Sequence, residues 1–313
     1  MTDGSRPDRC DISIVICTHD RATVLEKSLS CLLSCDPPSH TAVELLVVAN
    51  ACQDDTLQML DALQQSNASN FVIRVLVEPR PGKSRALNLA IQQSTAPVLC
   101  FVDDDQHVEV EFIQTVIRAL GHSPDYGIIC GFLMPEWDGT EADWVHEQGQ
   151  YYIPIRAIPE YNKGSDIREI KPDEQQPSGG NITLRRSLLD RMPMHFDVDV
   201  GPQGRTLEGG EDHDFLLRAR QQGGKIIYHP AIRQWHIVQH ERLKTAYMLK
   251  KAFHRSYVSF QLHRAHRIKP YMIRSLLSHA LKCLFSFGHN RRFYYMIRIA
   301  AVSGEIKAAF DFK

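Results

Sequence analysis

The sequence of 313 residues lacks the features that mark several special classes of protein. No apolar run is long enough to span a bilayer, and the N-terminal segment MTDGSRPDRC is polar, without the apolar core of a signal peptide. The eight cysteines form no metal-ligand pattern with histidine, and Cys31 and Cys35, four residues apart on an expected helix, are interpreted as core filling rather than a site. These absences predict a protein of a reducing cytosol with free thiols.

Net charge is also nearly absent, at −1, but the balance hides an asymmetry. Residues 241–313 carry 15 Lys and Arg against 3 Asp and Glu, so the remaining 240 residues have a net charge of −13. We therefore expect two parts, a catalytic domain over residues 1–240 and a basic helical extension over residues 241–313.

Short β-branched runs alternate with helical patterns through the first half of the chain. Strands are expected at 12–17, 43–49, 71–77 and 98–102, with later strands at 128–134 and 225–228, and each of the first four precedes a helical pattern. Strands that alternate with helices predict an α/β fold with a mainly parallel sheet flanked by helices. The polar turns that follow these strands should then gather along one edge of the sheet, where such folds bind ligands.

The acidic run Asp103-Asp104-Asp105 directly follows the apolar strand 98–102. Three adjacent carboxylates cannot lie unpaired in a core, although a solvated acidic turn would also tolerate them. Alternation along an extended chain places Asp103 and Asp105 on one face, where their oxygens suit Mg²⁺ or Mn²⁺ bound to a diphosphate.

Basic residues follow the third expected strand. Gly82-Lys83-Ser84 is not a P-loop, because Val77 stands where that motif requires a glycine. A Gly-Lys pair that opens a helix beside Arg80 can still hold a phosphate, and the alternative is a plain exposed basic turn.

Two glycine-containing segments in the second half indicate a site. Gly179 and Gly180 precede Asn181 and would let the backbone approach a ligand closely. Further on, Glu208-Gly209-Gly210-Glu211-Asp212-His213-Asp214 opens a helical pattern; some of these acids are explained by helix capping, but four with two glycines are not. A carboxylate at a helix start stays ionised and can accept a proton from a hydroxyl.

Taken together, these segments resemble the inverting family 2 glycosyltransferases, which have the nucleotide-binding fold called GT-A. The resemblance covers residues 12 to about 240 and depends on six motifs in order. They are Ser13-Ile14-Val15-Ile16-Cys17-Thr18 with Arg21, Val47-Val48-Ala49-Asn50 with Asp54, Gly82-Lys83 with Ala86-Leu87-Asn88, Phe101-Val102-Asp103-Asp104-Asp105, Gly179-Gly180-Asn181, and Glu211-Asp212.

The resemblance implies a role for each matching residue. Asp212 would be the catalytic base, with Glu211 beside it, and Asp105, Asp103 and His236 would hold the metal. Asn50 stands where many members have an aspartate that reads uracil. Gly179, Gly180 and Asn181 would contact the acceptor or the sugar, and the donor nucleotide would meet Thr18, Arg21, Asn50, Asp54, Arg80, Lys83, Asp103 and Asp104.

The resemblance further implies a metal-dependent, inverting transfer of one sugar from a nucleotide-diphosphate sugar to an acceptor hydroxyl. The cofactor would be Mg²⁺ or Mn²⁺, and the donor a UDP-sugar, with GDP- and dTDP-sugars as alternatives. The acceptor would be a glycan or a lipid-linked sugar of a cell-surface pathway.

The Gln-x-x-Arg-Trp signature of processive synthases is absent, since Gln234-Trp235-His236 does not match it. Two other readings are a nucleotidyltransferase that makes nucleotide sugars, which usually has a glycine-rich loop after its first strand, and a non-catalytic nucleotide-sugar binder.

The basic extension mixes aromatic and cationic residues along expected helices. Such helices suit an anionic membrane surface, which predicts a cytoplasmic protein peripheral to the inner face of the membrane. The alternative is a helical cap packed on the catalytic domain. Nucleic-acid binding is not expected, because the body is acidic and carries no binding motif of that kind.

Overall fold

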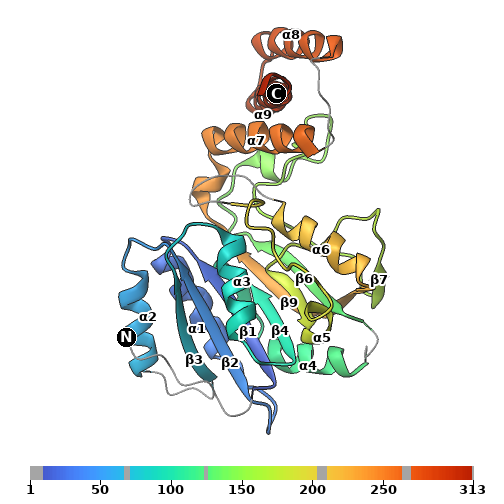
Figure 1. Ribbon diagram of the computed structural model, residues 1–313. Helices are drawn as coiled ribbons and strands as arrows, with labels where there is room; N and C mark the ends of the chain where they lie inside the picture. Colours follow the sequence, from blue (N-terminus) through green and yellow to red (C-terminus); the bar gives the residue numbers. More distant parts are fainter. Residues whose placement is uncertain (1–9, 67–70, 123–125, 203–209, 263–268, 312–313) are drawn as a thin grey trace. The chain divides into compact units, whose positions relative to one another are not determined.

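The computed structural model describes residues 10–66, 71–122, 126–202, 210–262 and 269–311 (Figure 1). The chain divides into two units. The limits of the first are Met1–Pro135, Pro159–Arg205 and Gly210–Ile237, and those of the second are Glu136–Ile158, Thr206–Gly209 and Val238–Lys313. The limit at Ile237 lies close to residue 240, where the composition changes, and Glu136–Ile158 also belongs to the second unit.

The first unit is built on a nine-stranded sheet whose path is β3-β2-β1-β4-β8-β6-β9-β5, with β7 paired to β9 (Figure 1). The first four strands are parallel, as the alternating pattern predicts. They are β1 Ile12–Thr18, β2 Val43–Asn50, β3 Phe71–Glu78 and β4 Val98–Val102. Their carboxyl ends therefore lie at the same edge of the sheet.

The second half of the sheet is antiparallel. Strand β8 pairs antiparallel with β4 and β6, and β9 pairs antiparallel with β5 and β7. The strands are β5 Gln106–Val108, β6 Ile128–Glu136, β7 Arg168–Ile170, β8 Asn181–Arg185 and β9 Ile226–Ile237. This half brings residues distant in sequence to the end of β4, because Val102 lies opposite Asn181 and Gln106 lies opposite His236.

Helices cover both faces of the sheet, and successive residues along a strand point alternately into two hydrophobic cores. Ile14 and Ile16 of β1 pack with α1, α2 and α4, whereas Val15 packs on the opposite face with α3, α5 and α6. This alternation is the period of two that an extended strand imposes. The helices are α1 Ala22–Leu33, α2 Thr56–Ser66, α3 Lys83–Gln93, α4 Phe112–His122, α5 Arg186–Leu189 and α6 Glu211–Gln221. The expected α/β fold class is confirmed.

The second unit is helical and has its own core. Trp144, Ile153, Ile158, Phe293 and Ile297 are buried together, and the rings of Trp144 and Phe293 meet edge to face at 4.9 Å. Its elements are the 3₁₀ turns Asp143–Val145 and His240–Leu243 and the helices α7 Thr245–Leu262, α8 Pro270–Leu284 and α9 His289–Asp311. Within the described residues, no helix is both long and apolar enough to cross a membrane.

Candidate active site

The acids after β4 lie in a turn, because the strand ends at Val102 and the amide of Gln106 donates to the carbonyl of Asp103. The regular alternation used to place Asp103 and Asp105 on one face therefore stops at Val102, and this part of the prediction is corrected. Asp104 and Asp105 are both buried, whereas Asp103 is partly exposed and faces Lys83.

Arg21 pairs with both buried acids, which share its single positive charge. Its guanidinium donates to a carboxylate oxygen of Asp104 and, at 2.9 Å, to Oδ2 of Asp105. Thr18 Oγ1 adds a hydrogen bond of 2.7 Å to Asp104. Burial still raises the pKa of Asp104 to about 6, although Arg21 opposes that rise. Burial alone would lower the pKa of Arg21, but the two carboxylates raise it.

His236 reaches the same cluster from the far half of the sheet. Its Nδ1 lies 3.4 Å from Oδ1 of Asp105, and the ring is buried. Neither ring nitrogen of His236 makes a hydrogen bond to any part of the chain that the structure describes. The buried carboxylate is the oxygen donor that Mn²⁺ and Mg²⁺ prefer, and the imidazole with two unsatisfied nitrogens adds a nitrogen donor for a divalent metal.

Lys83 connects this cluster with a second pair of acids. Its ammonium donates to Oδ1 of Asp103 at 3.0 Å and lies 3.7 Å from Oε1 of Glu211. Burial would lower the pKa of Lys83, but Asp103, Asp212 and Glu211 together raise it well above its usual range. Lys83 is therefore a fixed cation between two carboxylate groups.

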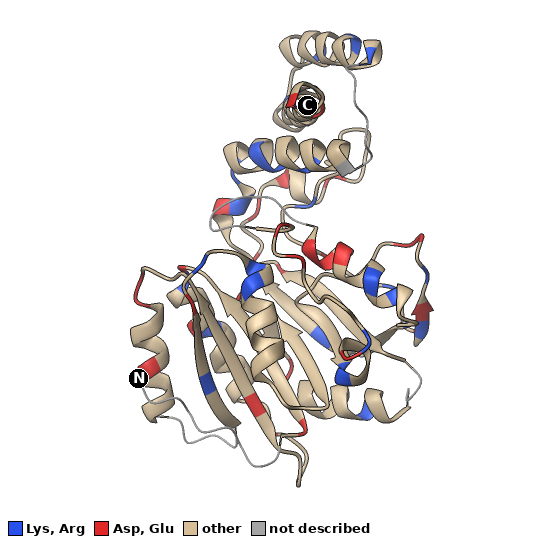
Figure 2. Ribbon diagram, viewed as in Figure 1, with Lys and Arg blue, Asp and Glu red and all other residues tan. Residues whose placement is uncertain are grey.

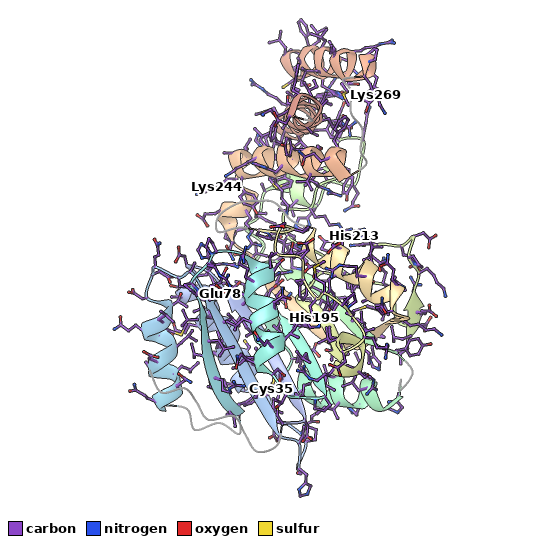
Figure 3. The ribbon with its side chains drawn as sticks, in the orientation of Figure 1. Cys35, Glu78, His195, His213, Lys244 and Lys269 are labelled. Carbon is purple, nitrogen blue, oxygen red and sulfur yellow. The ribbon has the colours of Figure 1, made fainter. Side chains whose placement is uncertain are left out.

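Glu211 and Asp212 open helix α6, whose acidic first turn is visible in Figure 2. Burial and the neighbouring Asp212 raise the pKa of Glu211 to about 7 against the opposing charge of Lys83. Burial also raises the pKa of Asp212, again opposed by Lys83. The adjacent His213 and Asp214 do not join this pair in the contacts described; His213 is labelled in Figure 3, and Asp214 is paired with Arg218 on the helix.

The two oxygens of Asp212 have different surroundings. Oδ2 accepts a hydrogen bond of 2.7 Å from the amide of Gly179. Oδ1 is buried and has no hydrogen-bond partner among the described residues. A buried carboxylate oxygen left without a donor is costly, which indicates a position for a further hydrogen-bond donor.

Gly179 and Gly180 make the close approaches that their sequence pattern predicts, although the groups approached are the site's own acids. A Cβ on Gly179 would lie 2.1 Å from Oδ1 of Asp212, and one on Gly180 would lie 2.4 Å from Cγ of Asp103. Asn181 holds the sheet together instead, because its side chain donates to the carbonyl of Gly131 and accepts from its amide.

Three of the residues expected to contact the nucleotide hold the loops of this edge. Asn50 is buried, accepts from the amide of Gly82 at 2.8 Å and donates to the carbonyls of Glu78 and Arg80. Asp54 accepts from the amides of Ala22 and Thr56. Arg80 is exposed and pairs with Glu78, which Figure 3 labels at the end of β3.

Two buried glutamines were not singled out from the sequence. Gln234 donates to Oε1 of Gln106 and to the carbonyl of Gly180, both at 2.9 Å, and the same Oε1 accepts from the amide of Asp103. They hold the acidic turn against the glycine segment. The position of Gln106 directly after the acidic run was the signal available in the sequence, but only the antiparallel pairing of β5 with β9 shows the two glutamines meeting.

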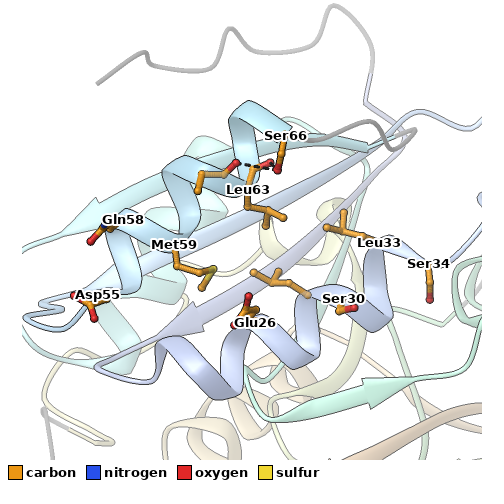
Figure 4. A pocket seen from close by; sticks show the side chains of 11 residues that line it. Glu26, Ser30, Leu33, Ser34, Asp55, Gln58, Met59, Leu63 and Ser66 are labelled. Atoms are coloured by element: carbon orange, nitrogen blue, oxygen red, sulfur yellow. Dashed lines mark hydrogen bonds between the residues drawn. The ribbon is translucent and has the colours of Figure 1, made fainter.

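Two other features of the first unit lie apart from these acids. A cavity of about 920 Å³ opens between α1 and α2, and none of the predicted site residues lines it (Figure 4). Within the described chain, the ligand atoms of Asp20, Cys52 and Asp54 lie within 4.8 Å of one another, and those of Asp103, Asp105 and His236 do not form such a group. Asp20 and Asp54 already accept hydrogen bonds from backbone amides. We therefore interpret the group of Asp20, Cys52 and Asp54 as part of the turns after β1 and β2 rather than as a metal site.

The mixed α/β sheet, with acids at the carboxyl end of a central strand and a second acid pair at a helix start, is the architecture of the GT-A fold class. The sequence pattern of the family described as glycosyl transferase family 2 matches residues 13–192, more than half of the chain. The chain belongs to this family, and it is a glycosyltransferase.

Individual relatives agree with this assignment. The chain is 20% identical over 249 residues to a glucosyl-dolichyl phosphate glucuronosyltransferase of Haloferax volcanii, covering 79% of this chain and 75% of that protein. It is 23% identical over 244 residues to the succinoglycan biosynthesis protein ExoM of Rhizobium meliloti, covering 77% and 72%.

Two solved structures share the fold. The mannosyltransferase PcManGT from Pyrobaculum calidifontis, in complex with GDP-Man and Mn²⁺, has a TM-score of 0.56 at 18% identity, covering 93% of this chain and 74% of that one. S. aureus TarS 1-349 in complex with UDP-GlcNAc has a TM-score of 0.56 at 14% identity, covering 96% and 91%.

Proposed function

We propose that this protein moves a single sugar from a nucleotide-diphosphate sugar to an acceptor hydroxyl, with inversion at the anomeric carbon and with a divalent metal. The observation that carries the proposal is the unsatisfied Oδ1 of Asp212, buried at the start of α6 and linked through Lys83 to the acids after β4. The proposed base, a lysine cation and side chains suited to bind a metal thus belong to one connected group.

Asp212 is the proposed base. Its Oδ2 is fixed by the Gly179 amide, so Oδ1 is free to accept a hydrogen bond from the acceptor hydroxyl and then its proton. Attack on the face opposite the leaving group inverts the anomeric carbon in one displacement, and no covalent nucleophile is needed. Burial raises the pKa of Glu211 to about 7, so Glu211 is partly protonated near neutral pH and repels Asp212 less than a fully ionised carboxylate would.

Asp105 and His236 are the residues that would hold the metal. The two unsatisfied nitrogens of His236 beside the Asp105 carboxylate support this assignment, and Asp103 lies at the same strand end, paired with Lys83. A divalent metal held there would supply positive charge that stabilises a diphosphate leaving group. Lys83 supplies a fixed charge from the chain itself, and Arg21 holds Asp104 and Asp105 in place.

Donor and acceptor are proposed in class only. Thr18, Asn50, Asp54 and Arg80 belong to the turns expected to border the nucleotide, and Gly179, Gly180 and Asn181 to the segment expected to border the acceptor. The solved neighbours carry GDP-Man or UDP-GlcNAc, which supports a nucleotide-diphosphate sugar. The name of the Haloferax relative includes a dolichyl phosphate, which supports a lipid-linked acceptor, with a soluble glycan as the alternative. A lipid-linked acceptor agrees with a cytoplasmic protein peripheral to the membrane.

The deciding experiment incubates the protein with a panel of UDP-, GDP- and dTDP-sugars and Mg²⁺ or Mn²⁺, and separates the products. Release of a free nucleoside diphosphate with transfer to an added acceptor is the expected result. Release or consumption of pyrophosphate would identify a nucleotidyltransferase, and donor binding without turnover across the acceptors would favour a non-catalytic binder.

A further inference from the structure

Helix α8 of the second unit has an apolar stripe that points away from its own core. Met272 and Leu276 face inward and pack with Phe260, Val302 and Ala308. On the other side of the helix, Leu277 is 61% exposed and Leu281 is 57% exposed. Ile273 and Leu284 are also exposed and continue the stripe at spacings of four and three residues.

The stripe continues beyond the end of the helix. Phe285 directly follows Leu284, Phe287 comes two residues later, and Phe287 is 91% exposed. Four exposed apolar helix positions, followed within three residues by two exposed phenylalanines, exceed the scattered exposure normal for a soluble protein, which marks an interaction surface. We call this surface the α8 face; its residues are Ile273, Leu277, Leu281, Leu284, Phe285 and Phe287.

The segment that contains the α8 face carries positive charge, and the next acid along the chain, Glu305, lies with Lys269 and Tyr271 at the start of α8. Residues 269–304 contain Lys269, Arg274, Lys282, Arg291, Arg292 and Arg298 but no Asp or Glu. Figure 2 shows basic and no acidic positions on α8. Arg274 and Lys282 are exposed on the helix flank beside the apolar stripe.

We propose that the α8 face docks the protein on an anionic lipid bilayer, with the helix lying in the plane of the interface. An apolar stripe bordered by cations is the pattern of interfacial helices, whose apolar side enters the acyl boundary while the cations meet anionic headgroups. At 15 residues, α8 is about 22 Å long, so it lies on the bilayer and does not cross it. The inference stands on the second unit alone and does not depend on the proposed function.

A second copy of the chain would fit this surface less well. Two α8 faces brought together would bring Arg274, Lys282, Arg291 and Arg292 of each copy near like charges, and residues 269–304 offer no carboxylate to pair with them. An anionic headgroup layer supplies the missing negative charge.

The test is cosedimentation of the full-length protein with vesicles. Vesicles of phosphatidylcholine with one third phosphatidylglycerol are compared with vesicles of phosphatidylcholine alone, each at low and at high salt. We expect binding to the anionic vesicles that weakens with salt, because exposed charges are screened. Leu277→Glu/Leu281→Glu should reduce the partition coefficient at least tenfold.

A matched control makes the same charge change on the first unit. Val110 and Ile167 are each 55% exposed, and Val110→Glu/Ile167→Glu should leave vesicle binding within about twofold of the parent. Arg274→Gln/Lys282→Gln should weaken binding to anionic vesicles several-fold and remove much of its salt dependence. Circular dichroism and the thermal unfolding temperature show whether each variant is folded.

The outcomes separate the alternatives. Equal binding by the parent and Leu277→Glu/Leu281→Glu, both folded, would overturn the proposal, as would no binding by the parent. Concentration-dependent dimerisation of the parent that this variant abolishes, without vesicle binding, would assign the α8 face to a second copy. Nucleoside diphosphate release with a water-soluble acceptor should be unchanged in Leu277→Glu/Leu281→Glu. A loss of vesicle binding in this variant is therefore distinguishable from a failure of the proposed reaction.

Discussion

The site contains two acid pairs that the chain treats differently. Asp104 and Asp105, after β4, are held by the Arg21 guanidinium, and Asp104 also accepts from Thr18. Glu211 and Asp212, at the start of α6, have the more distant Lys83 as their counter-charge, and Asp212 keeps one oxygen without a partner. Burial raises the pKa of Asp104 in the first pair as well as those of Glu211 and Asp212, so the pKa shift does not separate the two pairs. A carboxylate pair held by a direct ion pair suits fixed binding of charge, whereas a pair with an unsatisfied oxygen suits proton transfer.

The largest predicted effect removes the proton acceptor from the second pair. Asp212→Asn keeps the shape and the hydrogen bond from Gly179 but cannot take a proton, so turnover should fall by about 10²–10⁴. Donor affinity and the unfolding temperature should stay near those of the parent. The measurement is single-turnover sugar transfer with donor binding measured separately by calorimetry.

Asp214→Asn is the matched control for that change. Asp214 lies on the same first turn of α6 but pairs with Arg218, so its variant should turn over within a few-fold of the parent. If Asp212→Asn were equally mild, the base would have to be Glu211, or the mechanism would have to be a retaining one.

The next prediction acts on the first pair. Asp105→Ala removes the carboxylate beside His236 and should weaken metal-dependent nucleoside diphosphate binding by about 10- to 100-fold, while the fold persists. Calorimetric titration of UDP and GDP, with Mn²⁺ and with a chelator, measures the effect. Binding that is the same for parent and variant under both conditions would remove Asp105 from the metal site.

A third substitution tests whether Gly179 positions the carboxylate of Asp212. A Cβ at Gly179 would overlap the Asp212 carboxylate, so Gly179→Ala should displace that side chain and lower turnover by about tenfold. Gly121→Ala is the control, since nothing lies within 4 Å of a Cβ at that helical position. The control should be neutral or slightly stabilising, by up to about 1 kcal/mol. Equal turnover in both variants would argue against tight positioning of Asp212 by Gly179.

The sequence predicts the parallel half of this protein well and the antiparallel half poorly. The strand expected at 98–102 is confirmed to the residue as β4, and the strand expected at 12–17 is one residue shorter than β1. Local apolar runs flanked by polar turns define such strands, and adjacent βα units then pair in parallel. In contrast, β9 runs to Ile237, far beyond the expected 225–228, because its pairing with β5 and β7 depends on residues distant in sequence.

The candidate site, like the sheet, can be predicted only in part from the sequence. Residue types identify Asp105, Lys83 and Asp212 as candidates, and the structure joins Asp103, Lys83 and Glu211 through one ammonium group. What the sequence does not reveal is which polar residues are already used. Asn50 and Asn181 are residue types that often contact ligands, yet their side-chain amides form hydrogen bonds with backbone groups of the fold.

The smallest predicted effect concerns stability and pH, and it sharpens the difference between the two acid pairs. The pKa of Glu211 rises from its ordinary 4.5 to about 7 in the folded protein, chiefly because it is buried. Between these values the folded chain retains a proton that the unfolded chain releases. The contribution of Glu211 to stability is therefore complete below pH 4.5 and is lost as pH rises to about 7.

Glu211→Gln removes this titration, because the amide resembles the protonated acid at every pH. The variant should match the parent at pH 4 and be more stable at pH 8, by on the order of 1–3 kcal/mol; the raised pKa from which this gain follows already includes the attraction of Lys83. Urea unfolding at both pH values measures the difference, with Asp214→Asn as a variant expected to show no such gain. A parent that is the more stable protein at pH 8 would mean that Glu211 is ionised in the folded state and serves as a counter-charge for Lys83, as Asp103 does.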